Sequence, residues 1–212
     1  MSVLRKGRKK MRKKSLLILG LVGCLSVISP VTVLAESNLQ SKTDLVWTSP
    51  TIFKELIREI EDIKKEHPVY TEDDILRIMN ERHATTHDEE DAKGIIDIWN
   101  ALTESEKKLC IRYPFDALKV NTAKNIATNQ TEIKFGRNGL GDKSDAFRHG
   151  IWNAEMTILI GKEKAELFAT AHEDKDITGT ESDGFPKTAH RDMDLHNNAV
   201  GREIGEDNNK AT

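Results

Sequence analysis

Three short stretches in the second half of the chain combine histidine with acidic and amide residues at helical spacing. The first, "DAFRHGIWNAEM", places Asp145, His149, Trp152 and Met156 on one stripe of a helix, at steps of three and four residues. Asp145 lies one turn before His149 and can hold one nitrogen of its ring. Carboxylates and imidazoles rarely lie on a buried stripe unless a partner pairs with them there. The stretch therefore indicates a reactive or metal-holding site.

Two further stretches repeat this combination. In "AELFATAHE", His172 ends an apolar helical stripe. In "HRDMDLHNNAVGREIG", Asp192 and His196 lie four residues apart, a spacing that suits a chelating pair. Apolar periodicity predicts that the buried stripe of this third stretch consists of Met193, Asn197, Val200 and Ile204. Three consecutive helices thus each bring a histidine to their buried face or next to it.

A divalent metal is the first kind of chemistry that this pattern favours. His149 and His172 would supply imidazole nitrogens, for which zinc is the favoured metal, and Glu173 would act as general base on the bound water. The third ligand would be Asp192, Asp194 or His196. The sequence lacks the H-E-x-x-H motif, so the motif specificity of a zinc hydrolase is absent.

A metal-free site is the second possibility. Asp145 would orient His149 as general acid and base, and Arg148 would stabilise negative charge on the substrate. Alternatively, Arg148 forms a buried salt bridge to Glu155 or Glu173. The predicted catalytic residues are Asp145, Arg148, His149, Glu173 and Asn197. A purely structural polar core is the alternative to both kinds of chemistry.

Helical signals dominate the elements that must position these residues. Helix starts are predicted at Ser49-Pro50, at the Thr71–Asp74 and Thr103–Glu106 boxes, at Pro114 and at Asp142 or Ser144. The last two helices are expected over residues 162–173 and from about His190 to Ile204. Only "QTEIKFG", residues 130–136, looks extended, so we predict an all-α, multi-helix fold with a polar His/Asp/Glu/Asn core site.

The first 35 residues have the layout of a secretory signal peptide: a basic head, an apolar run and small residues before a cleavage site after Ala35. A lipoprotein signal ending at Cys24 is the alternative, and an uncleaved anchor is a third option that Pro30 argues against. We expect a secreted or cell-surface protein that contacts the membrane only through this leader.

Charge and cysteine content limit the possible binding partners and the possible covalent cross-links of the mature chain. The leader carries eight of the 32 Lys and Arg and none of the 35 Asp and Glu, so its removal changes the formal net charge from −3 to −11. Such an acidic chain disfavours nonspecific nucleic-acid binding. Only Cys110 remains after cleavage, which excludes an intramolecular disulfide. A cell-envelope substrate or a protein partner stays open.

The composition divides the chain after the leader. Residues 36–90 are charged and amphipathic and are predicted to form an N-terminal helical appendage. Residues 91–212 hold the three stretches described above and are predicted to form the functional domain.

Taken together, "GDKSDAFRHGIWNAEMT", "AELFATAHE" and "MDLHNNAVGREIG" resemble a family of bacterial secreted domains of unknown function. The resemblance covers about residues 95–205. It implies the motif positions Asp145, Arg148, His149, Trp152, His172, Glu173, Asp194, Asn197 and Asn198. It implies an exported all-helical domain and no particular activity.

The sequence thus favours an exported hydrolase, metal-assisted, that acts on an ester or phosphoester. A noncatalytic envelope- or partner-binding module, whose polar core only maintains the fold, is the alternative.

Overall fold

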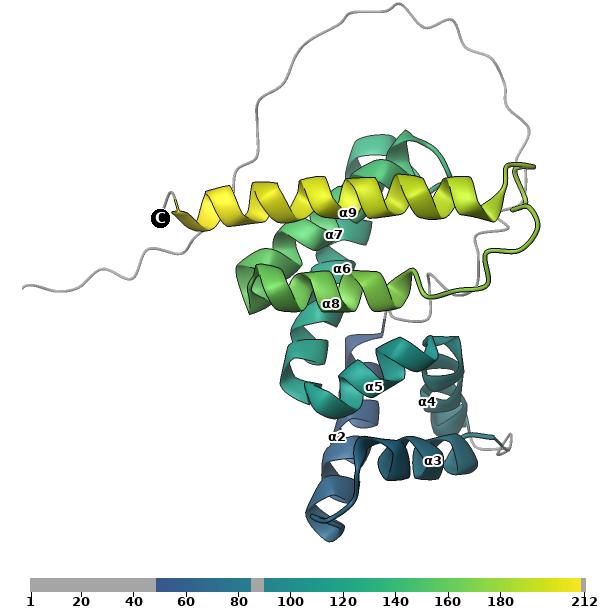
Figure 1. Ribbon diagram of the computed structural model, residues 1–212, viewed down its shortest axis with the longest axis vertical. Helices are drawn as coiled ribbons and strands as arrows, with labels where there is room; N and C mark the ends of the chain where they lie inside the picture. The colour runs from purple at the N-terminus through teal and green to yellow at the C-terminus, as the bar shows by residue number, and fades with distance from the viewer. Residues whose placement is uncertain (1–48, 85–89, 211–212) are drawn as a thin grey trace, which may run out of the picture. The chain divides into compact units, whose positions relative to one another are not determined.

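The computed structural model describes residues 49–84 and 90–210, with the backbone alone for residues 90–93 (Figure 1). Within these ranges the chain forms eight α-helices, and a single isolated bridge, Thr180 to Pro186, is the sole β-type pairing. The predicted all-α fold is confirmed. The predicted signal peptide lies outside the described residues.

The first helices begin where their capping residues predict. Helix α2 (Pro50–Glu66) is capped by Ser49, whose hydroxyl accepts a hydrogen bond from the Ile52 amide. Helix α3 (Glu72–Arg82) has a complete capping box, in which Thr71 and Asp74 each accept a hydrogen bond from the other's backbone amide. Helix α4 (Glu90–Ala101) follows.

A second capping box starts α5 (Glu104–Arg112), where Thr103 and Glu106 bond reciprocally as predicted. Helix α6 (Pro114–Phe135) begins at its proline and ends at Gly136, which has a φ of 68°. The prediction that residues 130–136 are extended is wrong, because residues 130–135 complete α6. Thr131, although β-branched, is buried there and donates its hydroxyl hydrogen to the Ala127 carbonyl.

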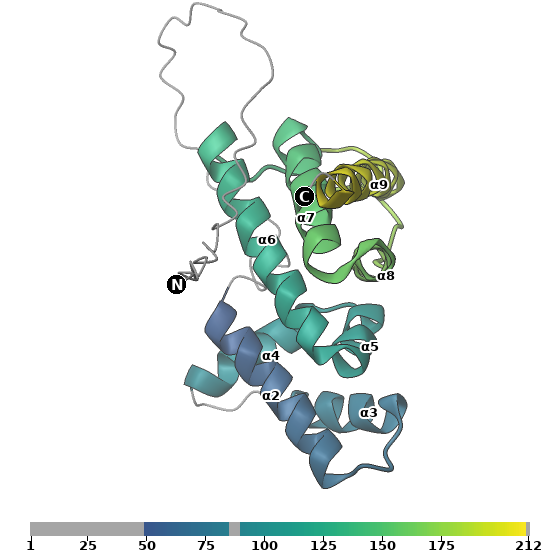
Figure 2. The same cartoon turned by 90° about the vertical axis from the view of Figure 1, so that its left-hand side faces the viewer.

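Three helices carry the residues singled out by the sequence. They are α7 (Lys143–Ile160), capped by Asp142, α8 (Lys162–His172), and α9 (Lys187–Lys210). Helix α7 packs against α6, α8 and α9, and α8 also packs against α9 (Figure 1). Figure 2 shows α9 end-on beside α7 and α8, so the three helices enclose a common interior.

Helix α9 faces this interior with a different stripe from the one predicted. Its buried residues are His190, Asp194, Asn198, Gly201 and Gly205. Val200 and Ile204, predicted to be buried, are 44% and 46% exposed. The reason is close helix packing, because a Cβ added at Gly201 would lie 2.3 Å from the Gly150 carbonyl oxygen of α7. The two glycines bring the helix backbones together, and α9 therefore turns its glycine and polar side inward.

The N-terminal helices share one hydrophobic core with the rest of the described chain. Phe53, Trp99, Val120 and Trp152, from α2, α4, α6 and α7, belong to the same cluster of buried side chains. Helix α2 packs on α4, α5 and α6 (Figure 2). The predicted domain boundary at residue 90 stays a prediction.

Among the described helices, none is both long enough and apolar enough to cross a membrane.

Candidate functional site

His149, on α7, lies between two aspartates in the interior formed with α9. Its Nε2 atom is 3.5 Å from Asp145 Oδ1 on the same helix and 3.5 Å from Asp194 Oδ1 on α9. The side chain of Trp152 meets the ring edge-on, with centroids 6.2 Å apart. His149 is 6% exposed, so both aspartates approach it in a largely water-free environment.

A network of amide side chains orients the His149 ring. Asn198 Oδ1 accepts a hydrogen bond from Asn153 Nδ2 at 2.6 Å, and Asn198 Nδ2 donates to Glu173 Oε1 at 3.2 Å. The same Oδ1 lies 3.1 Å from His149 Nδ1. Because a carbonyl oxygen only accepts, Nδ1 carries the proton in this network. In the neutral imidazole the lone pair is then on Nε2, the nitrogen beside the two aspartates.

Asp145 is held from two sides. The Gly141 amide donates to its Oδ2 at 2.7 Å, and Arg148 Nη2 donates to its Oδ1 at 2.5 Å. Arg148 also donates to the Gly139 carbonyl at 3.1 Å. Arg148 therefore forms a buried salt bridge with Asp145, which is not one of the two partners named from the sequence.

Asp194 has an incompletely satisfied carboxylate. It is 9% exposed, and its Oδ1 is buried without forming a hydrogen bond to any described residue. Burial raises the pKa of this carboxyl to about 8, and the nearby charges of Asp145 and Glu173 add to the effect. A cation placed beside Oδ1 would stabilise the ionised form.

Asp145, His149 and Asp194 could hold a metal ion. Each offers one ligand atom, and these atoms all lie within 4.8 Å of one another. One imidazole nitrogen and two carboxylate oxygens form a donor set that suits zinc and other first-row divalent ions.

His172 lies beside this group but contacts other residues. Its Nδ1 is 2.7 Å from Glu106 Oε1 on α5, and its Nε2 is 3.3 Å from Lys175 Nζ. Its ring centroid is 6.2 Å from that of His149 and 5.0 Å from that of Trp152. The ring nitrogens of His172 thus lie beside Glu106 and Lys175, and its role as a metal ligand stays a prediction.

Asp192 and His196, predicted as ligands, are exposed on α9. The structure does not bring them into the group of Asp145, His149 and Asp194, and their role as ligands stays a prediction. Each lies two residues from Asp194, a rotation of about 200° around the helix, so they point away when Asp194 points inward.

The predicted catalytic Asn197 donates its amide to the Met193 carbonyl of its own helix at 2.8 Å. The next residue, Asn198, makes the contact to His149.

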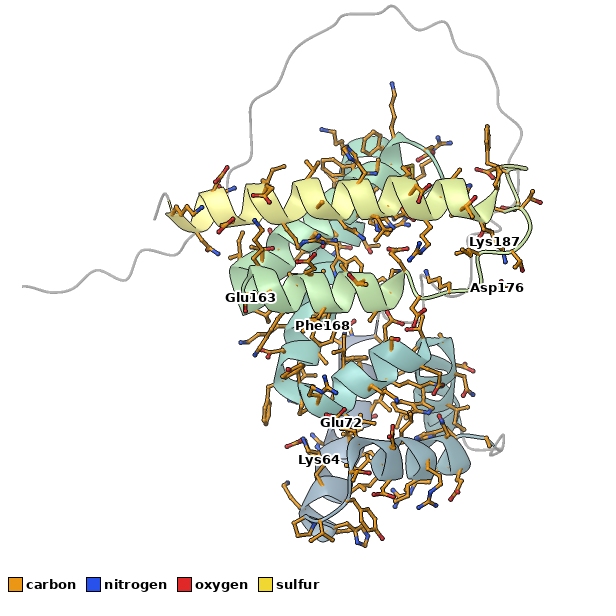
Figure 3. The ribbon with its side chains drawn as sticks, viewed as in Figure 1. Lys64, Glu72, Glu163, Phe168, Asp176 and Lys187 are labelled. Carbon is orange, nitrogen blue, oxygen red and sulfur yellow. The ribbon has the colours of Figure 1, made fainter. Side chains whose placement is uncertain are left out.

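A cavity of about 120 Å³ adjoins the three potential ligands. Its lining is strongly charged and comes from the loop before α7, from α7 and α9, and from the segment that joins α8 to α9. Figure 3 labels Asp176 and Lys187, which lie in that segment and in the first turn of α9. The lining residues are Leu140, Asp145, Arg148, His149, Glu173, Lys175, Asp176, Ile177, Glu181, Lys187, His190, Arg191 and Asp194.

Residues 107–212 match the model of the family described as "Domain of unknown function (DUF6973)". The chain belongs to this family. The DUF6973 region contains Asp145, His149 and Asp194 together with every residue that lines the cavity, whereas Glu106 lies just before it. No curated protein and no solved structure matches the sequence.

Sequence reasoning missed two residues of the DUF6973 site, His190 and Asp183. His190 lines the cavity, and its Nε2 is 3.0 Å from Asp183 Oδ2. The sequence contained one signal for His190, because this residue stands four positions, about one helical turn, before Asp194. Asp183 lies in a loop and had no periodic pattern that could reveal it.

Proposed function

We propose that this protein is a metal-assisted hydrolase that cleaves an ester or phosphoester outside the cytoplasm. The observation that carries the proposal is the grouping of Asp145, His149 and Asp194 around a cavity, with a buried Asp194 oxygen that forms no hydrogen bond. Three protein ligands are typical of catalytic zinc sites, which keep a coordination position for water or substrate, whereas structural sites use four.

The surrounding contacts resemble those that support metal ligands in other proteins. Metal-bound histidines usually donate their second ring nitrogen to an oxygen atom that fixes the tautomer, and Asn198 Oδ1 supplies that oxygen for His149. Arg148 and the Gly141 amide hold Asp145 in the same way. A bound divalent ion would polarise the substrate and lower the pKa of a water molecule beside it.

Basic residues at the cavity favour a phosphoester over a neutral ester. Lys175, Lys187 and Arg191 line it from the loop and from the start of α9. Arg148 is committed to Asp145, so these three are the cations that could approach a phosphate oxygen.

Glu173 has a positioning role in this proposal. Its Oε1 accepts from Asn198 and lies 3.7 Å from His149 Nδ1, on the side of the ring away from the two aspartates. Glu173 thereby holds the Asn198 amide, which orients the potential ligand His149. Its assignment as general base stays a prediction.

Action outside the cytoplasm is proposed from the leader-like sequence of residues 1–35. Bacterial origin is part of the same proposal.

Metal binding to Asp194→Asn tests the proposed function, with Asp192→Asn as the matched control on the same helix. Isothermal titration of the metal-free protein with Zn²⁺ and Mn²⁺ should give one site in the wild type. Asp194→Asn loses a charged ligand and should bind the metal more than about 100-fold more weakly than the wild type. Removing a residue that only hydrogen-bonds to a ligand already lowers metal affinity by about 10–100-fold. Asp192→Asn should bind as the wild type does, because Asp192 is exposed.

Circular dichroism of both variants checks that they remain folded. Equal binding by the wild type and Asp194→Asn, or no binding by any protein, would overturn the proposal. The latter result would support the alternative of a noncatalytic module with a structural polar core.

A further inference from the structure

A second histidine at the same cavity, His190, pairs with Asp183 and has no part in holding the proposed metal. His190 Nε2 is 3.1 Å from Asp183 Oδ1 and 3.0 Å from Oδ2. Because a carboxylate accepts, Nε2 carries the proton, and in the neutral imidazole Nδ1 carries the lone pair. Asp183 is itself fixed by the Phe185 amide, which donates to its Oδ1 at 3.0 Å and holds the pKa of Asp183 below its usual value.

The Nδ1 edge of His190 lies beside Gly141, whose amide holds the potential metal ligand Asp145. His190 is 9% exposed, and its Nδ1 is buried without a hydrogen bond to any described residue. A Cβ added at Gly141 would lie 2.3 Å from His190 Cε1 and 3.0 Å from Nδ1, so this edge packs on Gly141. The amide of Gly141 donates to the ligand Asp145.

His190 also lies on the same side of α9 as Asp194. The two residues are four apart, about 6 Å along the helix axis. Both line the cavity of about 120 Å³ with Asp145 and His149. An imidazole with a buried lone pair, oriented by a carboxylate and placed one helical turn from a potential metal ligand, has the arrangement of a general base.

We infer that His190, oriented by Asp183, is the proton-transfer residue of this site. The inference rests on the proposed hydrolase function. It assigns to His190 the role that sequence reasoning gave to Glu173.

The proposed hydrolysis needs neither an oxidant nor a reductant. A water oxygen forms a bond to the phosphorus or carbonyl carbon of the ester while its proton passes to His190 Nδ1. The bond from that centre to the leaving oxygen then breaks, and the imidazolium returns the proton to this oxygen. Between these two proton transfers, Asp183 stays ionised and stabilises the imidazolium of His190. The products are an acid and an alcohol.

His190→Gln and Asp183→Asn test the inference, with His196→Gln as the matched control because His196 is an exposed histidine of the same helix. The substrates are bis(p-nitrophenyl) phosphate, p-nitrophenyl phosphate and p-nitrophenyl acetate, assayed with saturating Zn²⁺ or Mn²⁺. Loss of general acid–base catalysis should lower the rate by about 100-fold or more in His190→Gln. Metal affinity should stay within about twofold of the wild type in all three variants.

A readout independent of turnover comes from nitrogen NMR of the metal-free protein. His190 should be protonated on Nε2 in the wild type, and Asp183→Asn should abolish this preference. Asp183, with its side chain partly exposed, serves as the second variant if His190→Gln does not fold.

Wild-type rates in His190→Gln with intact metal binding would overturn the inference and leave the proposed function standing. Protonation of wild-type His190 on Nδ1 would overturn it too. A wild type that binds no metal or hydrolyses none of the substrates would overturn both proposals.

Discussion

Single amide and carboxyl groups determine the chemistry available to the site. Asn198 receives hydrogen bonds from Asn153 and His149 on one oxygen and donates to Glu173 with its nitrogen. This fixes which nitrogen of His149 faces the two aspartates. A residue of the same size without the amide could not satisfy these three partners, so the identity of Asn198 matters more than its volume.

Glu106 makes the stability of the protein depend on pH. Burial raises the pKa of its carboxyl from 4.5 to about 7. Below pH 4.5 the group is protonated in both folded and unfolded states. As the pH rises from 4.5 to 7, the unfolded state ionises first, so the stabilising contribution of the neutral buried carboxyl is progressively lost. Glu106→Gln cannot ionise and should not show this loss.

Urea denaturation of both proteins at pH 5, 6, 7 and 8 measures this effect. The free energy of unfolding of the wild type, relative to Glu106→Gln, should fall between pH 5 and pH 7 and level off above the folded pKa. Glu104→Gln removes an exposed carboxylate from the same turn and controls for the loss of charge alone. A difference that stays constant or increases over this range would contradict the prediction.

At the scale of the element, glycine packing sets the rotation of α9. In an exposed helix, replacing glycine by alanine stabilises by about 1 kcal/mol. At Gly201 the added Cβ would lie 2.3 Å from the Gly150 carbonyl oxygen and 2.9 Å from Asn153 Cβ. Steric overlap should therefore dominate over helix propensity.

We expect Gly201→Ala to lower the free energy of unfolding by about 1–2 kcal/mol, as overpacking generally does. Gly150→Ala is the matched control, because its added Cβ would meet no neighbouring atom within 4 Å. It should stabilise by up to about 1 kcal/mol. Urea denaturation measures both changes. A stabilised Gly201→Ala would show that α9 does not pack on α7 as described.

At the scale of the whole described chain, the continuous core predicts one cooperative unfolding transition. Trp99 donates to Asn80 of α3 at 2.8 Å and reports on the N-terminal helices, whereas Trp152 lies in the site. Both belong to one buried cluster. Unfolding of either end would expose apolar surface of the other, so the two should unfold together.

Two variants of residues 36–212 each keep one of the two tryptophan probes. Trp47, the third tryptophan, is replaced by Phe in both, together with Trp152→Phe in one variant and Trp99→Phe in the other. In each variant, the fluorescence midpoint in urea should coincide with the midpoint from circular dichroism at 222 nm. Earlier loss of the Trp99 signal would instead support an independent N-terminal appendage, which is the organisation predicted from composition.

The site could be predicted from the sequence in part. Asp145 and His149 lie four residues apart on one helix, so their proximity follows from helical geometry alone. Asp194 was among the candidates, but the choice between it and its neighbours Asp192 and His196 depended on the rotation of α9. His190 and Asp183 were missed because their pairing joins a helix to a loop.

Local chemistry thus determined the fold class and most helix boundaries. The caps at Ser49, Thr71 and Thr103, the proline of α6 and the cap at Asp142 satisfy backbone groups within a few residues, and such contacts can be read along the chain. Tertiary structure alone decided which side of α9 is buried. Apolar periodicity predicted Val200 and Ile204 inside, but Gly201 and Gly205 allow two helix backbones to approach closely, and this packing depends on a partner helix about 50 residues away in the sequence.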